Sequence, residues 1–262
     1  MLTAGQDRMM NKINQWIETG RELISSLLFP ARCPVCDEIL EPEEIDKGIH
    51  HACECKLYYI HGAVCMHCGR PFGDDNPFKE YCYDCINKGY AKESFIAQGK
   101  SLYLYKRTAK QMMYRFKYSN KQEYATFFAK QAMKQYAFWI KERGIDVIVP
   151  VPMYRGKQRH RGYNQAECFA KQLSLYSGIP VDLGLVYRVQ DTAPQKGLDA
   201  AARRNNLKKA FQKGKFVVQY NCAMVVDDIY TTGSTAEAVA RELKNIGICQ
   251  VYLLTICIGE DR

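Results

Sequence analysis

The sequence predicts an α/β protein: a mainly parallel sheet with helices on both faces, preceded by a small cysteine-rich module. Two observations lead to this prediction. Eight of the twelve cysteines lie within a stretch of 53 residues, before residue 90. From about residue 95 onward, apolar strand patterns alternate with helical patterns, which is the order expected of a parallel sheet with crossover helices. With 47% apolar and 25% charged residues among 262, the composition excludes a disordered, collagen-like or coiled-coil chain.

The α/β part can be divided into elements from its hydrophobic periodicity. Strands are predicted at about 95–105, 146–152, 222–229 and 249–258, and helices at roughly 108–117, 121–142, 163–177, 199–207 and 235–246. Ligands of such sheets bind outside the carboxyl ends of the strands. We therefore expect the functional residues to follow the strands.

The N-terminal residues have a different pattern. Residues 7–28 carry apolar side chains mostly at three- and four-residue spacing, which predicts an amphipathic helix that ends before Pro30. Such a helix packs on the protein's own body, or docks on a membrane surface or a partner. Composition then divides the chain into this helix (1–30), a cysteine module (31–90) and the α/β domain (91–262).

The charge is distributed as unevenly as the cysteines. The net charge of +9 is the balance of −5 over residues 1–90 and +14 over residues 91–262. A positive field favours an anionic partner, such as a nucleotide, a phosphosugar, nucleic acid or an acidic lipid. The first thirty residues lack the features of a secretory signal, and the sequence has no uncharged apolar stretch of about 18 residues to span a bilayer. We therefore expect a cytoplasmic protein, soluble or peripheral to a membrane.

The clustered cysteines have the spacing of metal ligands. Two C-x-x-C pairs, at 65–68 and 82–85, are 13 residues apart and match a zinc ribbon, in which two tight turns present four thiolates to one tetrahedral ion. A further pair at 33–36 is followed by a closer C-x-C pair at 53–55, which predicts a second, less regular zinc site. In a reducing cytoplasm, paired spacing favours metal over disulfides. Four thiolates close the coordination shell, so the expected role is structural. The candidate ligands are Cys33, Cys36, Cys53, Cys55, Cys65, Cys68, Cys82 and Cys85.

The spacing leaves alternatives for the ligand sets. His50 and His51 lie close enough in sequence to replace a cysteine, and His67 lies inside the 65–68 pair. An interleaved arrangement, in which 33–36 and 65–68 share one ion, also fits. The other four cysteines fall within predicted helices or strands and are interpreted as small core residues: Cys168, Cys222, Cys249 and Cys257.

Residues 225–235 (VVDDIYTTGST) connect an apolar strand to a helix through two carboxylates and a small hydroxylated loop. The backbone N–H groups of such a loop, at a helix N-terminus, favour a monophosphate. Asp227 and Asp228 would repel that anion. Their position therefore indicates that they bind a neutral or cationic group, such as a ribose diol or Mg²⁺. A phosphate group and a diol together indicate ribose 5-phosphate as the ligand. The alternative is that the segment binds no ligand and is a capped strand-to-helix turn with a solvated acidic pair. A Walker lysine and a G-x-G-x-x-G motif are both missing, which argues against a nucleoside triphosphatase or a dinucleotide site.

The same segment resembles the 5-phosphoribosyl 1-pyrophosphate (PRPP) motif of type I phosphoribosyltransferases. Together with the cysteine pairs and three further blocks, it is similar to the ComF family of competence-associated phosphoribosyltransferase-like proteins. The blocks are VPVPMYRGKQRHRGYNQA at 149–166, T-x-x-Q-x-x-L at 192–198 and R-x-x-N at 203–206. The resemblance covers nearly the whole chain. It implies an N-terminal double zinc ribbon, a type I phosphoribosyltransferase-like fold, a PRPP-type site, and an association with DNA-uptake proteins at the inner face of the membrane.

The resemblance also implies roles for individual residues. Asp227 and Asp228 would accept hydrogen bonds from the ribose hydroxyls of PRPP bound with Mg²⁺. The phosphate loop would comprise Ile229, Tyr230, Thr231, Thr232, Gly233, Ser234 and Thr235. The pyrophosphate loop would comprise Val151, Pro152, Met153, Tyr154 and Arg155, with Lys157, Arg159 and Arg161 as further cations, and Gln195 and Arg203 would belong to a mobile flap.

Three functions are compatible with these features. The first is phosphoribosyl transfer from PRPP to an acceptor that the sequence does not identify, and turnover is left open. The second is binding without catalysis: residues 153–163 mix aromatic side chains with cations, a composition that also suits single-stranded DNA, while a solvated basic loop is the plain alternative. The third is an adaptor that uses the zinc ribbons to dock on proteins.

Overall fold

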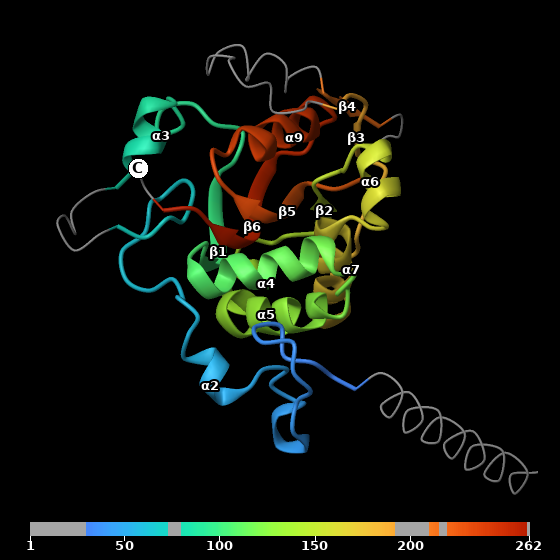
Figure 1. Ribbon diagram of the computed structural model, residues 1–262. Coiled ribbons are helices and arrows are strands. Elements are labelled where there is room, and N and C mark those ends of the chain that lie inside the picture. The colour runs from blue at the N-terminus through green and yellow to red at the C-terminus, as the bar shows by residue number, and fades with distance from the viewer. Residues whose placement is uncertain (1–29, 73–79, 192–209, 215–218, 261–262) are drawn as a thin grey trace, which may run out of the picture. The chain divides into compact units, whose positions relative to one another are not determined.

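The computed structural model describes residues 30–72, 80–191, 210–214 and 219–260 (Figure 1). The chain forms two compact units, Met1–Cys55 and Lys56–Arg262. The predicted helix over 7–28 lies outside the described residues. Across the described ranges, every helix falls short of a membrane-spanning segment in length or in apolar content.

The first unit is short and rich in turns, as predicted for a cysteine module. A single β-bridge joins Arg32 to Ile39. A 3₁₀ turn, η1 (Pro42–Glu44), and one turn of helix, α2 (His51–Glu54), follow. Such small elements bury little apolar surface, so a metal is the expected source of stability here.

The second unit is built on a four-stranded parallel sheet. Its strands are β1 (Gln98–Leu104), β2 (Val147–Pro150), β5 (Cys222–Tyr230) and β6 (Gln250–Ile258), in the order β1-β6-β5-β2. All three neighbouring pairs are parallel. This confirms the predicted sheet, and all four of its strands lie where the periodicity placed them.

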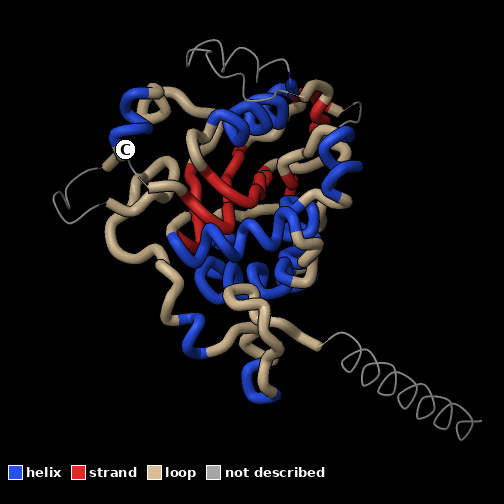
Figure 2. Tube along the Cα trace, viewed as in Figure 1, coloured by secondary structure: helices blue, strands red, loops and turns tan. Residues whose placement is uncertain are grey.

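Helices cover both faces of the sheet, as predicted (Figure 2). Helix α5 (Tyr124–Glu142) contacts β1, and α7 (Gln165–Ser177) contacts β2 and β5. Helix α4 (Arg107–Tyr118) lies beside α5 on the same side (Figure 1). Helix α9 (Ser234–Asn245) packs on β5 and β6 from the other side.

Four small elements in the described part of the second unit were not predicted. Helix α3 (Tyr83–Asn87) begins inside the 82–85 cysteine pair. Helix α6 (Arg155–Arg161) occupies the segment 153–163 that the sequence suggested as a basic loop. Strands β3 (Val186–Arg188) and β4 (Phe211–Lys213) form an antiparallel hairpin that packs against α9. Elements of three to seven residues span too few periods for a hydrophobic pattern to reveal them. The helix predicted over 199–207 lies outside the described residues.

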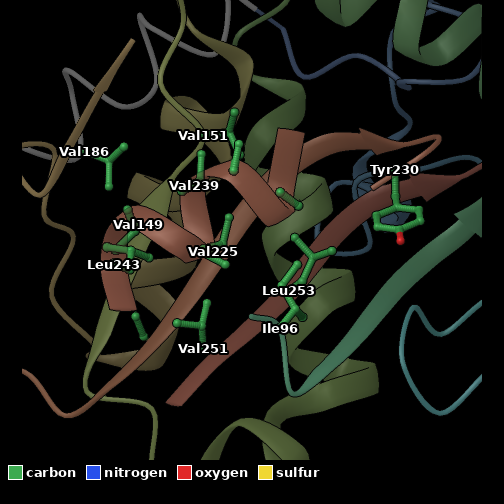
Figure 3. Packing of buried hydrophobic residues seen from close by; sticks show 14 of the residues in the cluster. Ile96, Val149, Val151, Val186, Val225, Tyr230, Val239, Leu243, Val251 and Leu253 are labelled. Atoms are coloured by element: carbon green, nitrogen blue, oxygen red, sulfur yellow. The ribbon is translucent and has the colours of Figure 1, made fainter. Parts of the chain in front are cut away.

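Alternate residues of the strands form the core beneath α9 (Figure 3). Val149 of β2, Val225 of β5 and Val251 of β6 face Val239 and Leu243 of α9. All five side chains are at most 2% exposed. The core continues into the cysteine pairs at 65–68 and 82–85, which belong to the same buried cluster.

The boundary between the two compact units lies between residues 55 and 56. This boundary falls inside the cysteine module that composition predicts at 31–90. The first cysteine pairs lie in one unit, and the pairs at 65–68 and 82–85 lie in the unit that contains the sheet. The division at residue 90 remains a prediction from composition.

Candidate functional site

The pairs at 65–68 and 82–85 converge on one point. The Sγ atoms of Cys65, Cys68, Cys82 and Cys85 lie within 4.8 Å of one another, and those of Cys68 and Cys82 are 3.7 Å apart. All four side chains are at most 1% exposed. Four converging thiols in a dry environment are the donor set of a structural zinc ion. This cluster therefore fits the predicted zinc ribbon.

A tight turn orients the thiols of the cysteine pair at 65–68. The Gly69 amide donates to the Cys65 carbonyl at 2.9 Å, and the Cys65 amide donates to the Arg70 carbonyl at 2.8 Å. Gly69 has φ +74°, a conformation that other residues rarely adopt. The turn directs both thiols of the pair to the same side.

The first unit holds a second cluster, in which one ligand is a histidine. The ligand atoms of Cys33, Cys36, His50 and Cys53 lie within 4.8 Å of one another. His50 Nδ1 is 3.2 Å from Cys36 Sγ, and His50 Nε2 is 3.0 Å from the Ile39 carbonyl oxygen. The contact to the carbonyl fixes the ring and leaves Nδ1 for a metal, an arrangement common for zinc-bound histidines.

The structure does not place Cys55 among the converging ligand atoms, in contrast to the prediction from the sequence. Cys53 and Cys55 lie in and at the end of α2, and two helical residues differ by about 200° in direction, so their side chains point to opposite sides. Cys55 is exposed, whereas Cys53 is buried. His50, considered from the sequence as an alternative ligand, takes the fourth position. The interleaved arrangement is not seen either, because each cluster is built from ligands consecutive along the described chain.

Zinc content tests this ligand set. His50→Ala removes a ligand atom and is expected to lower the zinc content from about two ions per chain to about one. Cys55→Ser changes a neighbouring, exposed thiol and is expected to leave two. Both are measured by metal analysis of purified protein after dialysis. Loss of one zinc in the Cys55 variant, with two retained in the His50 variant, would restore the assignment made from the sequence.

The acidic pair lies near the carboxyl end of β5. Asp227 and Asp228 are partly buried, and Asp227 Oδ1 accepts a hydrogen bond from the Asp228 amide at 2.8 Å. Burial and the adjacent Asp228 carboxylate raise the pKa of Asp227 to about 7, although Lys117 and Arg188 oppose the shift. In the free site the Asp227 carboxyl is therefore incompletely ionised near neutral pH, which suits a hydroxyl group or a cation as its partner.

Lys117 is the direct partner of this pair. Its Nζ lies 2.9 Å from Asp228 Oδ2 at the last turn of α4. Burial lowers the pKa of Lys117, but the charge and hydrogen bond of Asp228 outweigh this effect and the net shift is upward. Neither Lys117 nor Arg188 was predicted for the site, because both are distant in sequence from residue 227 and no local pattern connects them to it.

The predicted phosphate loop joins β5 to α9. Thr231 and Thr232 are exposed, and Gly233, with φ +79°, precedes the first turn of α9. The hydroxyls of Thr232 and Ser234 are 3.2 Å apart. Ile229 and Tyr230, which the resemblance included in the loop, belong to β5 instead and pair with Cys257 and Ile258 of β6. The loop thus offers hydroxyls and backbone N–H groups at a helix N-terminus.

The predicted pyrophosphate loop begins beside the acidic pair. Val151 follows β2, and its amide donates to the Val226 carbonyl of β5 at 2.9 Å. The side chain of Asn164, at the start of α7, donates to the Val151 carbonyl at 3.0 Å. Pro152, Met153 and Tyr154 then lead into α6, where Arg155 and Arg159 are exposed. The loop therefore starts directly after β2, the strand that neighbours β5 with Asp227.

Cations from α4 and α6 meet in a cleft of about 490 Å³. Its lining includes Lys117, Lys157, His160 and Arg161. Lys157 pairs with Asp191 at 2.7 Å, and Arg161 lies over the Tyr118 ring, 4.9 Å from its centroid. A larger cleft of about 760 Å³ is lined by the pyrophosphate loop and the β3–β4 hairpin. The predicted flap residues Gln195 and Arg203 lie outside the described residues.

Comparison with known proteins places the chain in a family. The double zinc ribbon domain family matches residues 24–86. Competence protein F of Haemophilus influenzae is 30% identical over 200 residues, which are 72% of this chain and 82% of that protein. The chain belongs to the competence protein F family. Within this family, it is also 27% identical to DNA utilization protein YhgH of Escherichia coli K12, over 80% of this chain and 96% of that protein. Competence protein ComFC of Bacillus subtilis is 26% identical, over 80% and 82%.

Solved structures with similarity to this family member include phosphoribosyltransferases. A purine phosphoribosyltransferase from Pyrococcus horikoshii is 20% identical over 50% of this chain and 73% of its own, with a TM-score of 0.33. The glutamine PRPP amidotransferase of Bacillus subtilis is 16% identical over 54% of this chain and 30% of its own, with a TM-score of 0.36. The family resemblance stated from the sequence is confirmed by the relatives and by the zinc ribbon match.

Proposed function

We propose that the protein binds PRPP, or a related phosphoribosyl compound, at the carboxyl end of β5 and acts in DNA uptake. The names of its relatives, competence protein F and DNA utilization protein, support the second part. The first part is supported by one juxtaposition: an acidic pair, a hydroxylated loop at a helix N-terminus and a cation-lined cleft adjoin one another at this end of the sheet.

Each part of the ligand would meet a complementary group. The 5-phosphate would accept hydrogen bonds from the amides and hydroxyls of the loop at 231–235. The ribose hydroxyls would donate to Asp227 and Asp228, in competition with Lys117. The pyrophosphate would lie against the amides after Val151 and the cations of α6. The acceptor would occupy the larger cleft between the pyrophosphate loop and the β3–β4 hairpin.

In a transfer reaction, the bond from ribose C1 to the pyrophosphate oxygen breaks, a bond from C1 to the acceptor nucleophile forms, and the nucleophile loses its proton. Bound Mg²⁺ would neutralise charge on the departing pyrophosphate. The chain's own contribution would be to hold the ribose in place and to offer cations where the leaving charge develops. Of these, Lys157 and Arg161 line the cleft already.

Calorimetric titration with PRPP in Mg²⁺ tests the proposal. The wild-type protein should bind one PRPP per chain, and Asp227→Asn with Asp228→Asn should remove the binding while leaving the circular dichroism spectrum unchanged. Asp146→Asn is the matched control, because Asp146 is also a partly buried carboxylate but lies at the opposite end of the sheet, where it accepts hydrogen bonds from the Asn221 and Cys222 amides. Absence of binding by folded, zinc-loaded wild-type protein would contradict the proposal.

A second function has a specific observation in its favour. Tyr114 and Tyr118 of α4 are 63% and 61% exposed, and their rings lie 5.1 Å apart beside Arg161. Exposed aromatic rings next to cations suit the stacked bases of a single strand. Fluorescence anisotropy with a labelled oligothymidylate would then show an affinity that falls steeply with salt and weakens in Tyr118→Ala. An affinity unaffected by Tyr118→Ala would remove this surface from consideration.

A further inference from the structure

The cysteine cluster at 65–85 and the phosphate loop are joined by a buried polar network within the same unit. We propose that Arg70 and Glu237 hold the phosphate loop against this cluster, so that the affinity for a phosphorylated ligand depends on Arg70. The expected effect on ligand affinity rests on the proposed function. The positioning itself concerns only residues of the chain and can be tested without a ligand.

Arg70 is the first link. It follows the turn of the Cys65–Cys68 pair and is 1% exposed, although arginine is almost never fully buried unless its charge is paired. One guanidinium nitrogen donates to Asp84 Oδ2 at 2.9 Å, and Asp84 lies between Cys82 and Cys85. Another donates to the carbonyl oxygen of Thr231 at 3.1 Å. A single planar group therefore connects both halves of the cluster to the first residue of the phosphate loop.

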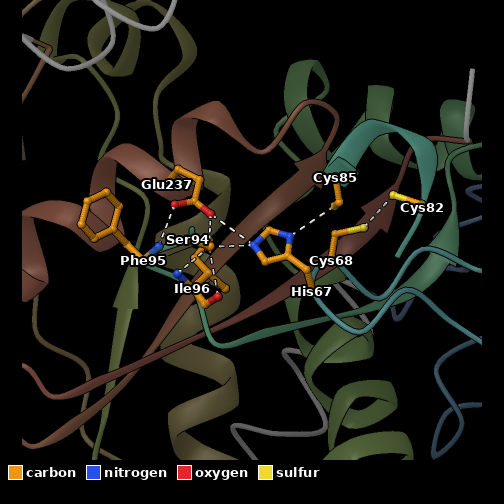
Figure 4. Close-up of polar contacts among 8 residues, drawn as sticks. All are labelled: His67, Cys68, Cys82, Cys85, Ser94, Phe95, Ile96 and Glu237. Carbon is orange, nitrogen blue, oxygen red and sulfur yellow. Dashed lines mark hydrogen bonds and ion pairs between the residues drawn. The ribbon is translucent and has the colours of Figure 1, made fainter. Parts of the chain in front are cut away.

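Glu237 is the second link (Figure 4). It lies in the first turn of α9, directly after the loop, and is 9% exposed. One carboxylate oxygen accepts from the Phe95 amide at 3.1 Å; the other contacts the Ser94 hydroxyl and lies 3.2 Å from His67 Nε2. The other nitrogen of His67 lies 3.3 Å from Cys85 Sγ. The start of α9 is thereby fixed to a residue that contacts a candidate metal ligand.

These two links hold both ends of the loop. Thr231 is fixed through its carbonyl by Arg70, and Glu237, whose amide donates to the Gly233 carbonyl at 2.9 Å, is fixed through its side chain. Groups that bind an anion through backbone N–H vectors must stay within about 0.5 Å of their productive positions. Residues that support metal ligands in the same way change metal affinity or activity by about 10- to 100-fold when they are removed, and we expect an effect of similar size here.

The decisive experiment compares Arg70→Met with Arg32→Met in the full-length, zinc-loaded protein. Arg32 is a matched control: it also adjoins a cysteine pair and donates to a backbone carbonyl, that of Asp37 at 2.7 Å, but it lies in the first unit. We expect Arg70→Met to bind PRPP at least about tenfold more weakly and Arg32→Met to bind it normally, with about two zinc ions per chain in both.

Hydrogen exchange of ligand-free protein provides the independent readout. Peptides covering residues 230–240 should exchange faster in Arg70→Met than in the wild type, and at the wild-type rate in Arg32→Met. Glu237→Gln preserves side-chain size and should accelerate exchange in the same peptides, which keeps the test available if Arg70→Met does not fold. Unchanged exchange in a folded, zinc-loaded Arg70 or Glu237 variant would overturn the inference. Absence of PRPP binding by the wild type, with accelerated exchange in the variants, would overturn the proposed function alone.

Discussion

Cys68→Ser is expected to leave the unit Lys56–Arg262 without a stable fold. Cys68 is 1% exposed and belongs to the same buried cluster as the sheet, so its loss affects the core and the metal together. A structural zinc site contributes about 10–16 kcal/mol in apparent free energy. That exceeds or matches the whole stability of a typical domain, about 5–15 kcal/mol. Circular dichroism and thermal melting of the purified variant should show loss of the cooperative transition.

Cys249→Ser is the control for this prediction. Cys249 is exposed and lies outside both cysteine clusters, so the melting temperature should stay within a few degrees of the wild type. Removal of zinc from the wild type with a strong chelator should reproduce the effect of Cys68→Ser. A Cys68 variant that melts cooperatively near the wild-type temperature would show that the sheet unit does not depend on this cluster.

Gly69→Ala is expected to have the second largest effect, because the turn of the cluster lies directly against strand β1. A Cβ atom at Gly69 would come within 2.4 Å of the carbonyl oxygen of Gly99, a backbone atom that no side-chain rotation can move away. The Gly99 amide donates to the His67 carbonyl across the same junction. Neither side can move without breaking the turn or the strand. The variant should lose at least about 4 kcal/mol of unfolding free energy, measured by urea denaturation.

Gly89→Ala separates this clash from the cost of the backbone conformation. Gly89 also has positive φ, +77°, but a Cβ there meets nothing within 4 Å. Its substitution should therefore cost only the strain of a left-handed residue, about 1–2 kcal/mol. Similar losses in the two variants would contradict the close approach of Gly69 and Gly99.

The two cysteine clusters show what spacing can and cannot predict. Two C-x-x-C pairs define a zinc site because each pair forms its own tight turn, and the cluster at 65–85 follows the prediction in every ligand. In the C-x-C pair at 53–55, α2 turns the two side chains apart, and only Cys53 lies in the converging group. A helix of four residues has no periodicity to reveal it, so the choice between Cys55 and His50 required coordinates.

The sequence predicts those residues of the candidate site that lie together in one recognisable segment, and it does not predict isolated residues from elsewhere in the chain. The segment 225–235 carries its own pattern of strand, carboxylates and hydroxylated loop, and the structure places it at the carboxyl end of a central strand as expected. Lys117 and Arg70 reach the same region from residues far away in sequence. Alternation of helices and strands predicts parallel pairing but not the order β1-β6-β5-β2, and that order decides which distant side chains meet.

The strand order also has a consequence for biosynthesis. Strand β6 lies between β1 and β5, although it is the last of the four along the chain. Until residue 258 has been made, β1 has no neighbouring strand in the sheet and one edge of β5 stays open. Exposed strand edges invite pairing with other chains, and distant strand pairs form slowly. The nascent protein therefore carries an open strand edge until its sheet can close, and we expect a chaperone that covers β5 during this interval to raise the yield of folded protein.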